Sequence, residues 1–439
     1  MVLLKCPFIG FNLMKISKFN STVEISDKYN LHYNALTDSF MLSRKGFVLS
    51  LNSSDEELEL LTVKGFIVDD FVDEDEILRN RANAIILRDS SFHLTINPTL
   101  DCNFSCWYCY EEKHKGSAMG EEVLSSVKKL LLKLGKRYEH LHLSFFGGEP
   151  LLCFRNVIIP IHKSLDTICK ENNCDYSTSF TTNGGIISNR ILSYLETMNV
   201  RNIQITMDGH RSFHDKTRYF TNQNGSYDII MNNINKLLKR NISVTLRINY
   251  TPENIHSIQD VANDVIETIH KDLRSLLIIR LHQVWQTTSE DLSSEIDDII
   301  EYFVDHGIRA LKPVFNNVYN PCYADYKHSA LVNYNGDVFK CTAIDFLNTQ
   351  REGYLANDGE IVWENDSVEK RLNSKFKSNA CNSCRIRPIC NGGCSQKALQ
   401  FDSKSYCILG FDETKKDQVV KDRFVASLHA EKLRNMHHS

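Results

Sequence analysis

The sequence lacks the features that would direct it to a membrane or to nucleic acid. None of its apolar runs reaches the roughly 18–20 residues that a membrane span needs. The 439-residue chain has 51 basic and 55 acidic residues, and the resulting net charge of −4 argues against a nucleic-acid-binding surface. Its first 15 residues interrupt their apolar stretch with Pro7 and Gly10 and show no small-residue cleavage site. We therefore expect a cytoplasmic protein that binds neither nucleic acid nor a membrane.

Cysteine is plentiful by contrast, with 14 residues in the chain. In a chain of this length without a signal peptide, cysteines indicate metal or redox chemistry rather than a disulfide framework. Ten of them are gathered in two segments, 102–109 and 322–407. We interpret the other four as buried or inert thiols: Cys6, Cys153, Cys169 and Cys174.

Strand and helix patterns alternate through the middle of the chain. The strand-like runs are 93–97, 141–146, 178–182, 202–207, 244–250 and 276–283. The helix-like stretches are 120–136, 155–172, 189–198, 227–239, 254–269 and 293–309. Six successive βα repeats predict parallel strands with right-handed crossovers. Because a closed barrel needs eight such units, we expect an α/β fold with an open, partial (β/α)6 TIM barrel, whose active site lies at the C-terminal ends of the strands.

The regions on either side of this barrel look different. Residues 1–88 carry short β-like runs and helix-like stretches, which predict a small α+β module. From residue 311 the alternation stops and cysteine becomes frequent. The sequence thus predicts three domains, 1–88, 89–310 and a cysteine-rich, loop-dominated 311–439.

Three cysteines directly follow the first barrel strand. Cys102, Cys106 and Cys109 have the spacing C-x3-C-x2-C, with the aromatic Tyr108 just before the last. Three thiolates on one loop can hold three corners of a [4Fe-4S] cluster and leave the fourth iron open to a small chelating molecule. A metal with a distant fourth ligand, or cysteines without any ligand, are the alternatives, and a lone three-cysteine loop fits a structural zinc site less well.

A second motif, Gly147-Gly148-Glu149-Pro150, stands at the end of the second strand. Its glycines let the backbone come close to a ligand, and its carboxylate can bind an ammonium group. Taken alone it also fits a plain turn. It gains weight because both motifs are expected at the same end of the barrel.

The cysteine motif after strand one and Gly-Gly-Glu-Pro after strand two resemble those of the radical S-adenosylmethionine (SAM) enzymes. The resemblance implies that the amine and carboxylate of SAM chelate the open iron, and that Glu149 accepts a hydrogen bond from the amine. It implies reductive cleavage of SAM to methionine and a 5′-deoxyadenosyl radical, which takes a hydrogen atom from the substrate. The positions that it places beside SAM are Tyr108, Gly147, Gly148, Thr182, Asn183, Thr206, Asp208 and Arg218, with Arg247 and Asn249 as further candidates.

The C-terminal cysteines follow the pattern C-x13-G-x4-C, then C-x2-C-x5-C-x3-C, then a last cysteine. Four cysteines in fourteen residues also fit a zinc knuckle. The whole pattern resembles the SPASM extension of radical SAM enzymes, which implies two auxiliary clusters and three [4Fe-4S] clusters in total. By this resemblance Cys322, Cys341 and Cys394 ligate auxiliary cluster I, and Cys381, Cys384, Cys390 and Cys407 ligate auxiliary cluster II. Cluster I is then one thiolate short, so it has an open iron or takes another ligand such as Cys6.

SPASM enzymes mostly modify peptides or proteins, and this resemblance predicts the function. We expect a maturase that oxidatively modifies a ribosomally made precursor peptide, by a crosslink or a related C–H functionalisation. Auxiliary clusters can accept the electron that such an oxidation releases. The expected partners are a precursor peptide with its leader and an electron donor such as flavodoxin or ferredoxin. Residues 1–88 then form a winged-helix-like module that binds the leader, with residues 29–43 as the exposed edge.

Two other functions compete with this one. Anaerobic sulfatase-maturing enzymes, which make formylglycine, usually place an aspartate after the second SPASM cysteine. Here Cys341 is followed by Thr342 and Ala343, and the nearest aspartate is Asp345, which counts against that activity. A non-catalytic iron–sulfur electron carrier is disfavoured because the cysteine loop and Gly-Gly-Glu-Pro are both intact. No catalytic acid or base stands out from the sequence.

Overall fold

The computed structural model describes residues 13–287, 291–312, 317–375, 379–401 and 406–438, and the chain forms two compact units. Unit 1 comprises Met1–Ile86, Phe315–Pro321 and Asn373–Val425. Unit 2 comprises Leu87–Val314, Cys322–Leu372 and Ala426–Ser439. The division of the chain near residues 88 and 310 stays a prediction, and Cys6 lies outside the described residues.

Unit 2 is built on a large, mostly parallel sheet. The order of its strands is β12-β11-β10-β9-β8-β7-β6-β13-β14-β15-β16, and the ladders from β12 to β13 are all parallel. The strands are β6 (Ser91–Ile96), β7 (His140–Phe145), β8 (Asp175–Thr182), β9 (Val200–Met207), β10 (Val244–Tyr250), β11 (Leu277–Gln283), β12 (Arg309–Leu311), β13 (Ser329–Val332), β14 (Asp337–Phe339), β15 (Gly353–Leu355) and β16 (Ile361–Trp363). The last three strands pair antiparallel.

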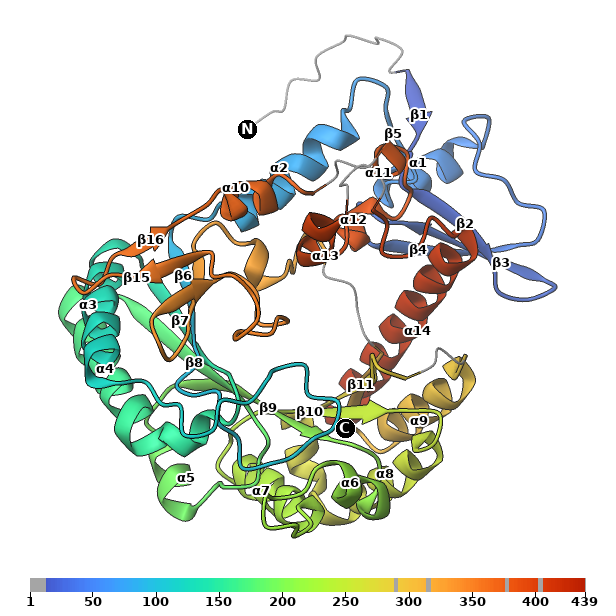
Figure 1. Ribbon diagram of the computed structural model, residues 1–439. Helices are drawn as coiled ribbons and strands as arrows, with labels where there is room; N and C mark the ends of the chain where they lie inside the picture. Colours follow the sequence, from blue (N-terminus) through green and yellow to red (C-terminus); the bar gives the residue numbers. More distant parts are fainter. Residues whose placement is uncertain (1–12, 288–290, 313–316, 376–378, 402–405, 439) are drawn as a thin grey trace, which may run out of the picture. The chain divides into compact units, whose positions relative to one another are not determined.

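Helices connect the parallel strands and lie along one side of them (Figure 1). They are α3 (Glu121–Arg137), α4 (Ile159–Asn172), α5 (Asn189–Leu195), α6 (Arg211–Thr217), α7 (Tyr227–Lys239), α8 (Ile258–Thr268) and α9 (Ser293–Asp305), and α10 (Ser367–Leu372) follows β16. The apolar positions of α3 recur at helical spacing, so that Leu124, Val127, Leu131 and Leu134 are all buried in the core.

The two faces of the sheet differ in polarity. In β7, Leu141, Leu143 and Phe145 are buried in the core with the helices, whereas His142 and Ser144 between them are only half-buried. The same alternation recurs in β9 and β11. Parallel strands that are covered by apolar layers on both faces have almost continuously apolar sequences. The alternation here shows that the face opposite the helices is lined with polar side chains.

All six strands and six helices that the sequence predicted in this region are present, and they confirm the α/β class. The largest shifts of a boundary are at the starts of α4 and α8 and at the end of α9. The prediction began α4 at residue 155, but the helix begins at Ile159, after two short turns, Pro150–Cys153 and Phe154–Ile158. Pro160 explains the difference, because proline is tolerated in the first turn of an α-helix and not in its interior.

Unit 1 combines the start of the chain with its cysteine-rich end. Its three-stranded antiparallel sheet has the order β2-β3-β4, and β1 pairs with β5. Its elements are β1 (Met14–Ile16), β2 (Asn20–Glu24), β3 (Tyr29–Asn34), β4 (Ser39–Arg44), α1 (Asp55–Val63), β5 (Ile67–Asp69), α2 (Glu74–Ile86), α11 (Asn379–Asn382), α12 (Arg387–Cys390), α13 (Ser395–Gln400) and the first part of α14 (Glu413–His438).

One hydrophobic core joins these two parts of unit 1. Phe19, Tyr33 and Leu78 from the start of the chain are buried together with Ile389 and Val420 from its end. The N-terminal segment is therefore part of the support for the cysteine-rich segment. Throughout the residues that the structure describes, no helix combines the length and the apolar character that crossing a membrane requires.

Candidate functional site

The three-cysteine motif lies on the loop between β6 and α3, at the C-terminal end of the first strand, as predicted. Cys102 and Cys106 are half-buried and Cys109 is exposed. Asp101 closes this loop, because its Oδ1 accepts a hydrogen bond from the Cys102 amide (2.8 Å) and its Oδ2 accepts one from the Gly116 amide (2.9 Å). The loop is thus held at both ends by one carboxylate.

The Gly-Gly-Glu-Pro segment is tied directly to this loop. The Gly148 amide donates to the Thr99 carbonyl (3.1 Å), and the Glu149 amide donates to the Asp101 carbonyl (2.8 Å). A Cβ atom on Gly148 would lie 2.2 Å from the Asp101 carbonyl oxygen, closer than any side chain can come. Gly147 has φ +98°, which favours glycine. The two glycines therefore allow the end of β7 to lie against the segment that leads into Cys102.

Glu149 is completely buried and organises the next strand end. Its carboxylate accepts hydrogen bonds from the Leu151 amide (3.0 Å), the Thr182 hydroxyl (2.8 Å) and the Asn183 amide (2.7 Å). Burial raises its pKa, and these hydrogen bonds act in the opposite direction. Asn183 in turn donates to the Asn103 side chain (2.7 Å), next to Cys102. The predicted contact of Glu149 with the SAM amine stays a prediction, and the structure adds this organising role.

Three polar side chains from other parts of the chain meet at the Tyr108 hydroxyl. Its hydroxyl donates to Asp208 Oδ2 (2.6 Å) and accepts hydrogen bonds from Arg218 Nη1 (2.9 Å) and Asn249 Nδ2 (3.0 Å). Arg218 Nε also lies 3.5 Å from Asp208 Oδ2. Asp208 Oδ1 is buried, and no donor among the described residues reaches it. An orphaned acceptor of this kind is what a ligand with hydroxyl or ammonium donors would satisfy.

These groups surround one cavity of about 1,030 Å³ at the strand ends. Its lining includes most of the residues that the sequence predicted beside SAM, namely Cys102, Cys106, Tyr108, Cys109, Gly147, Gly148, Thr182, Asn183, Thr206, Arg218, Arg247 and Asn249. Glu149 and Asp208 lie behind this lining and hold parts of it in place. The predicted residues of both motifs are thus brought together.

Several lining residues escaped the sequence analysis. They are Glu111, Lys113, Gln204, Gln283, Trp285 and Gln286. Trp285 stacks on Tyr110 with ring centroids 5.8 Å apart, and Gln286 donates to the Tyr108 carbonyl (2.8 Å). Burial, helped by the Asp345 carboxylate, raises the pKa of Glu111 to about 8. The loop after β11, which carries Trp285 and Gln286, has no spacing motif that would have revealed them.

The chemistry of the donor set fits an iron–sulfur cluster with SAM. Burial, with the Glu149 charge added, raises the pKa of Cys102 to about 12, so a thiolate there needs a bound cation. In the described part of the chain, no three His, Cys, Asp or Glu side chains converge closely enough to hold one metal ion. The ligands of a cubane bind different irons, so they stand further apart than the ligands of a single ion. Cys102, Cys106 and Cys109 would hold such a cluster beside the cavity.

Comparison with known proteins decides the family. Residues 96–265 match the model of the Radical SAM superfamily. The protein contains a radical SAM domain. The matched residues run from the end of β6 into α8, so the radical SAM domain includes both motifs and the Tyr108 network. A radical SAM domain implies a [4Fe-4S] cluster and SAM as cofactors.

The relatives of this radical SAM protein include maturases. The radical SAM cyclopropyl synthase TigE of Paramaledivibacter caminithermalis is 25% identical over 376 residues, 75% of this chain and 74% of TigE. A cysteine-type anaerobic sulfatase-maturating enzyme of Clostridium novyi is 24% identical over 69% of this chain and 88% of its own. The structure of Streptococcus suis SuiB bound to the precursor peptide SuiA matches this chain with a TM-score of 0.52 at 16% identity. The match covers 90% of this chain and 98% of the SuiB chain. At that identity the likeness to SuiB shows a shared fold.

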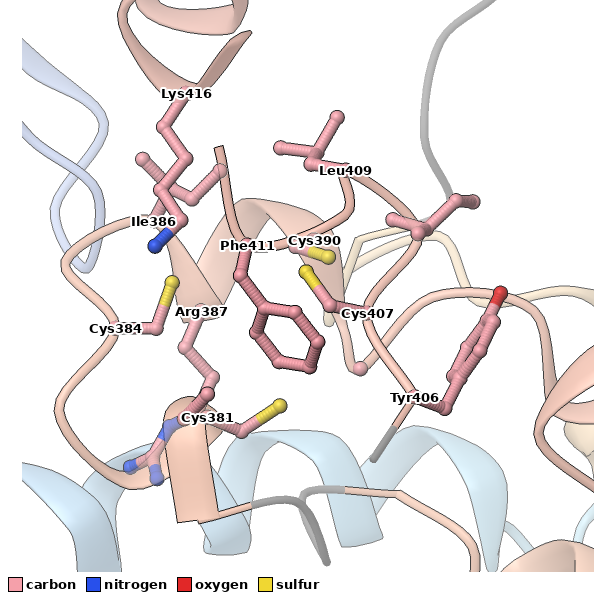
Figure 2. Close-up of a pocket in the computed structure, with 13 residues that line it drawn as sticks. Cys381, Cys384, Ile386, Arg387, Cys390, Tyr406, Cys407, Leu409, Phe411 and Lys416 are labelled. Atoms are coloured by element: carbon pink, nitrogen blue, oxygen red, sulfur yellow. The ribbon is translucent and has the colours of Figure 1, made fainter. Parts of the chain in front are cut away.

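Unit 1 holds a second group of thiols. Cys381, Cys384, Cys390 and Cys407 line one cavity of about 440 Å³, and Figure 2 shows them around Phe411. Burial and the other three thiols raise the pKa of Cys390 to about 12. The Lys416 ammonium lies beside Cys384, where it can balance the charge of thiolates. The four cysteines that the SPASM pattern assigns to auxiliary cluster II are therefore close together.

The three cysteines predicted for auxiliary cluster I are divided between the units. Cys322 and Cys341 are in unit 2, and after burial these two thiols contribute most to the raised pKa of Tyr323, so both lie near its hydroxyl. The Tyr110 hydroxyl, one residue after Cys109, donates to the Thr342 carbonyl (3.1 Å). Cys341 is thus linked to the cysteine loop of the radical SAM domain. Cys394 is in unit 1, and its assignment to cluster I stays a prediction.

Replacing Gly148 with alanine tests the contact between the two motifs. The new Cβ would meet backbone atoms of residues 100 and 101, so the cysteine loop or the end of β7 must shift, at a cost of about 1–3 kcal/mol. We expect the Gly148→Ala variant to bind SAM at least about tenfold more weakly, which calorimetry on the reconstituted protein would measure. Gly120→Ala is the matched control, because no atom lies within 4 Å of its added Cβ. Equal SAM affinity in both variants would contradict the close approach.

Proposed function

We propose that this protein is a radical SAM/SPASM maturase that oxidatively modifies a ribosomally made precursor peptide. The observation that carries this proposal is the single cavity on which the cysteine loop, Gly-Gly-Glu-Pro and the Tyr108 network converge. The modification is a crosslink or a related functionalisation of an unactivated C–H position. We further propose that the parallel strands form a partial (β/α)6 barrel and that the cysteine-rich segment is a SPASM domain of a cytoplasmic enzyme.

Residues of the chain account for the binding of each cofactor. Cys102, Cys106 and Cys109 hold the cluster, and Asp101 fixes their loop. Arg218 lines the cavity and its partner Asp208 lies just behind the lining, so opposite charges stand close to a ligand such as SAM, which carries both an ammonium and a carboxylate group. When bound, the reduced cluster supplies one electron to SAM, which releases methionine and a radical able to take a hydrogen atom from the peptide.

Two auxiliary [4Fe-4S] clusters complete the proposal. Cys381, Cys384, Cys390 and Cys407 hold auxiliary cluster II, and their shared cavity and the effect of the other three thiols on the pKa of Cys390 support this assignment. Cys322 and Cys341, with Cys394, hold auxiliary cluster I. The link from Tyr110 to Thr342 supports an electron-accepting role for cluster I near the cavity. An external donor such as flavodoxin or ferredoxin supplies the first electron.

The leader of the precursor peptide is proposed to add a strand to β4 in unit 1. In the described residues β4 pairs only with β3, so its outer edge has free backbone groups. On one face of this sheet, Leu31 of β3 stands between its register partners Val23 of β2 and Leu42 of β4. Leu42 is 53% exposed, while the other two side chains are buried. An apolar side chain of the leader would cover Leu42.

The substitution Leu42→Lys tests this edge. We expect it to weaken binding of the precursor peptide at least about fivefold, a cost of about 1 kcal/mol, because an ammonium group replaces apolar contact area. Cleavage of SAM without peptide is expected to stay unchanged. Val63→Lys is the control, because Val63 is an exposed apolar residue of the same unit at 79% exposure. Fluorescence anisotropy with labelled peptide would measure the peptide affinity of both variants. Equal affinities would refute binding of the leader at the β4 edge. Deleting residues 1–85 is a poorer test, because it would remove half of the unit 1 core.

Mass spectrometry tests the proposed reaction. The peptide encoded beside the gene is incubated without oxygen with the reconstituted protein, SAM and dithionite. We expect this peptide to lose two hydrogens while 5′-deoxyadenosine accumulates. A sulfatase peptide carrying Cys or Ser is the second substrate. Formylglycine in that peptide, with the neighbouring peptide unchanged, would replace the proposed activity with that of a sulfatase-maturing enzyme.

A further inference from the structure

The inner face of the parallel sheet, opposite the helices, carries two arginines where β10 and β11 pair. The inward positions of β7 to β11 alternate with the buried apolar ones. These inward residues are His140, His142, Ser144, Asp175, Ser177, Ser179, Thr181, Asn202, Gln204, Thr206, Thr245, Arg247, Asn249, Ile278, Arg280 and His282. The acidic residue among them is Asp175, the register partner of His140 at the start of β8. The part of the face formed by β10 and β11 carries two arginines and no acidic residue, so it favours an anionic ligand.

Two arginines stand side by side on this face. Arg247 of β10 and Arg280 of β11 are direct partners in the parallel register. Like charges at directly opposed positions of neighbouring strands destabilise a sheet. Both side chains are half-buried, and burial lowers the pKa of each guanidinium. The charge repulsion and the burial of the two guanidinium groups thus raise the free energy of the folded protein, and a bound anion would lower it.

Among the described residues no carboxylate pairs directly with these two guanidinium groups, although the Asp208 charge acts on Arg247 from a greater distance. Neither guanidinium has an aspartate or glutamate at ion-pair distance in the described part of the chain, whereas Arg218 has Asp208 at 3.5 Å. Arg247 uses its Nε to donate to Asn249 Oδ1 (2.9 Å), which leaves its two Nη groups for a ligand. Arg247 also lines the large cavity, so a ligand in that cavity can reach it.

The arginine pair lies deeper in the sheet than the Tyr108 network, to which Arg247 is joined through Asn249. Asn249 joins that network and stands one inward position further along β10, so Arg247 lies roughly 7 Å deeper toward the start of the strand. His282 is the register partner of Asn249. Burial and the nearby Arg247 and Arg280 lower the pKa of His282 to about 4, so it is neutral at pH 7 and can hydrogen-bond without adding charge.

We propose that Arg247, supported by Arg280, binds a carboxylate of the peptide substrate and thereby selects an acidic residue at or next to the modified position. This inference rests on the proposed function, because it assigns the substrate class of the same cavity. A guanidinium binds a carboxylate through two parallel hydrogen bonds, which gives direction as well as affinity. The bound carboxylate neutralises the arginine pair and fixes the peptide below SAM.

Matched peptide probes test the proposal on the reconstituted, SAM-loaded protein. The probes are acetyl-Gly-Glu-Gly-amide, acetyl-Gly-Gln-Gly-amide and acetyl-Gly-Gln-Gly with a free C-terminal carboxylate. Calorimetry is expected to show that at least one acidic probe binds about tenfold more tightly than the neutral one. The two acidic probes distinguish a side-chain carboxylate from a C-terminal one. Equal binding of all three probes to the unaltered protein would overturn the proposal without any variant.

Variants then assign the preference to the arginines. Arg247→Gln is expected to abolish the preference for the acidic probe, Arg280→Gln to reduce it, and Arg247→Lys to keep part of it. Arg190→Gln is the control, because Arg190 is an exposed arginine of α5, outside the strands of this face. Arg247 lies on the wall of the SAM cavity, so the dissociation constant of SAM is measured for every variant, and it is expected to stay within about twofold in Arg280→Gln and in the control. A weaker SAM affinity in Arg247→Gln, with the preference retained, would assign this guanidinium to the SAM carboxylate and overturn the proposal.

Failure of the carboxylate-site proposal can be distinguished from failure of the proposed maturase function. Iron content and formation of 5′-deoxyadenosine report on the radical SAM chemistry, and mass spectrometry reports on peptide modification. The ratio of acidic to neutral probe binding reports only on the arginine pair. Loss of peptide modification with an intact binding ratio would therefore refute the maturase proposal and leave the carboxylate site standing.

Discussion

Replacing Cys106 with alanine is expected to abolish formation of 5′-deoxyadenosine from SAM under dithionite. The loop would keep only two of its three thiolates, so the cluster beside the cavity would be lost or misplaced. We expect a rate loss of more than roughly 100-fold, which corresponds to at least about 2.7 kcal/mol of activation free energy. Chromatographic measurement of 5′-deoxyadenosine, with and without peptide, checks this.

The buried thiol Cys169 provides the matched control. It lies in α4, and its sulfur is 2.7 Å from that of Cys174, outside both thiol-lined cavities. The Cys169→Ala variant is expected to cleave SAM at the unaltered rate. If Cys106→Ala retained the activity of this control, the three-cysteine loop would not carry the cluster that cleaves SAM.

Replacing Cys390 with alanine is expected to separate SAM cleavage from peptide modification. Cys390 is one of four thiols on the unit 1 cavity, so its loss should remove about four iron atoms per chain. We expect peptide modification to fall by more than roughly 100-fold, while 5′-deoxyadenosine still forms in unit 2 within about threefold of the normal rate. Iron analysis and mass spectrometry measure the two effects.

A structural loss of unit 1 would give a different pattern. Cys390 stands against the core that joins the two ends of the chain, so circular dichroism should accompany the iron analysis. Cys390→Ser keeps the size of the side chain and is expected to behave like Cys390→Ala. Full iron content in a folded Cys390→Ser variant would contradict the assignment of this cysteine to auxiliary cluster II.

The repeating elements of the radical SAM domain could be predicted from the sequence because local patterns determine them. Strands β7, β9 and β11 bury alternate residues, and α3 and α7 bury one stripe, so their periods are visible in the chain itself. The motifs could be placed because each directly follows a strand, and parallel strands bring their C-terminal ends to one edge.

The roles of single side chains depended on contacts that no local pattern records. Glu149 was predicted as a SAM ligand, but its burial and its bonds to Thr182 and Asn183, more than 30 residues away, are tertiary features. The Tyr108 network likewise joins four segments of the chain. The pairing of Arg247 with Arg280 became visible only when the strand register was known.

The joint core of unit 1 was hidden for the same reason. The segments around Tyr33 and Ile389 are more than 300 residues apart in sequence, and the apolar residues of each segment fit a separate small domain equally well. The predicted boundaries at residues 88 and 310 follow changes in composition, which do not record which segments pack together.

Electron–nuclear double resonance tests the central claim most directly. The reduced, reconstituted protein is mixed with SAM that is isotopically labelled in its methionine amine and carboxylate. The account predicts hyperfine coupling of both labels to a cluster, and it predicts that this coupling disappears in Cys106→Ala and persists in Cys390→Ala. A reduced cluster whose spectrum is unchanged by labelled SAM would contradict the claim that an open iron at the Cys102–Cys109 loop binds it.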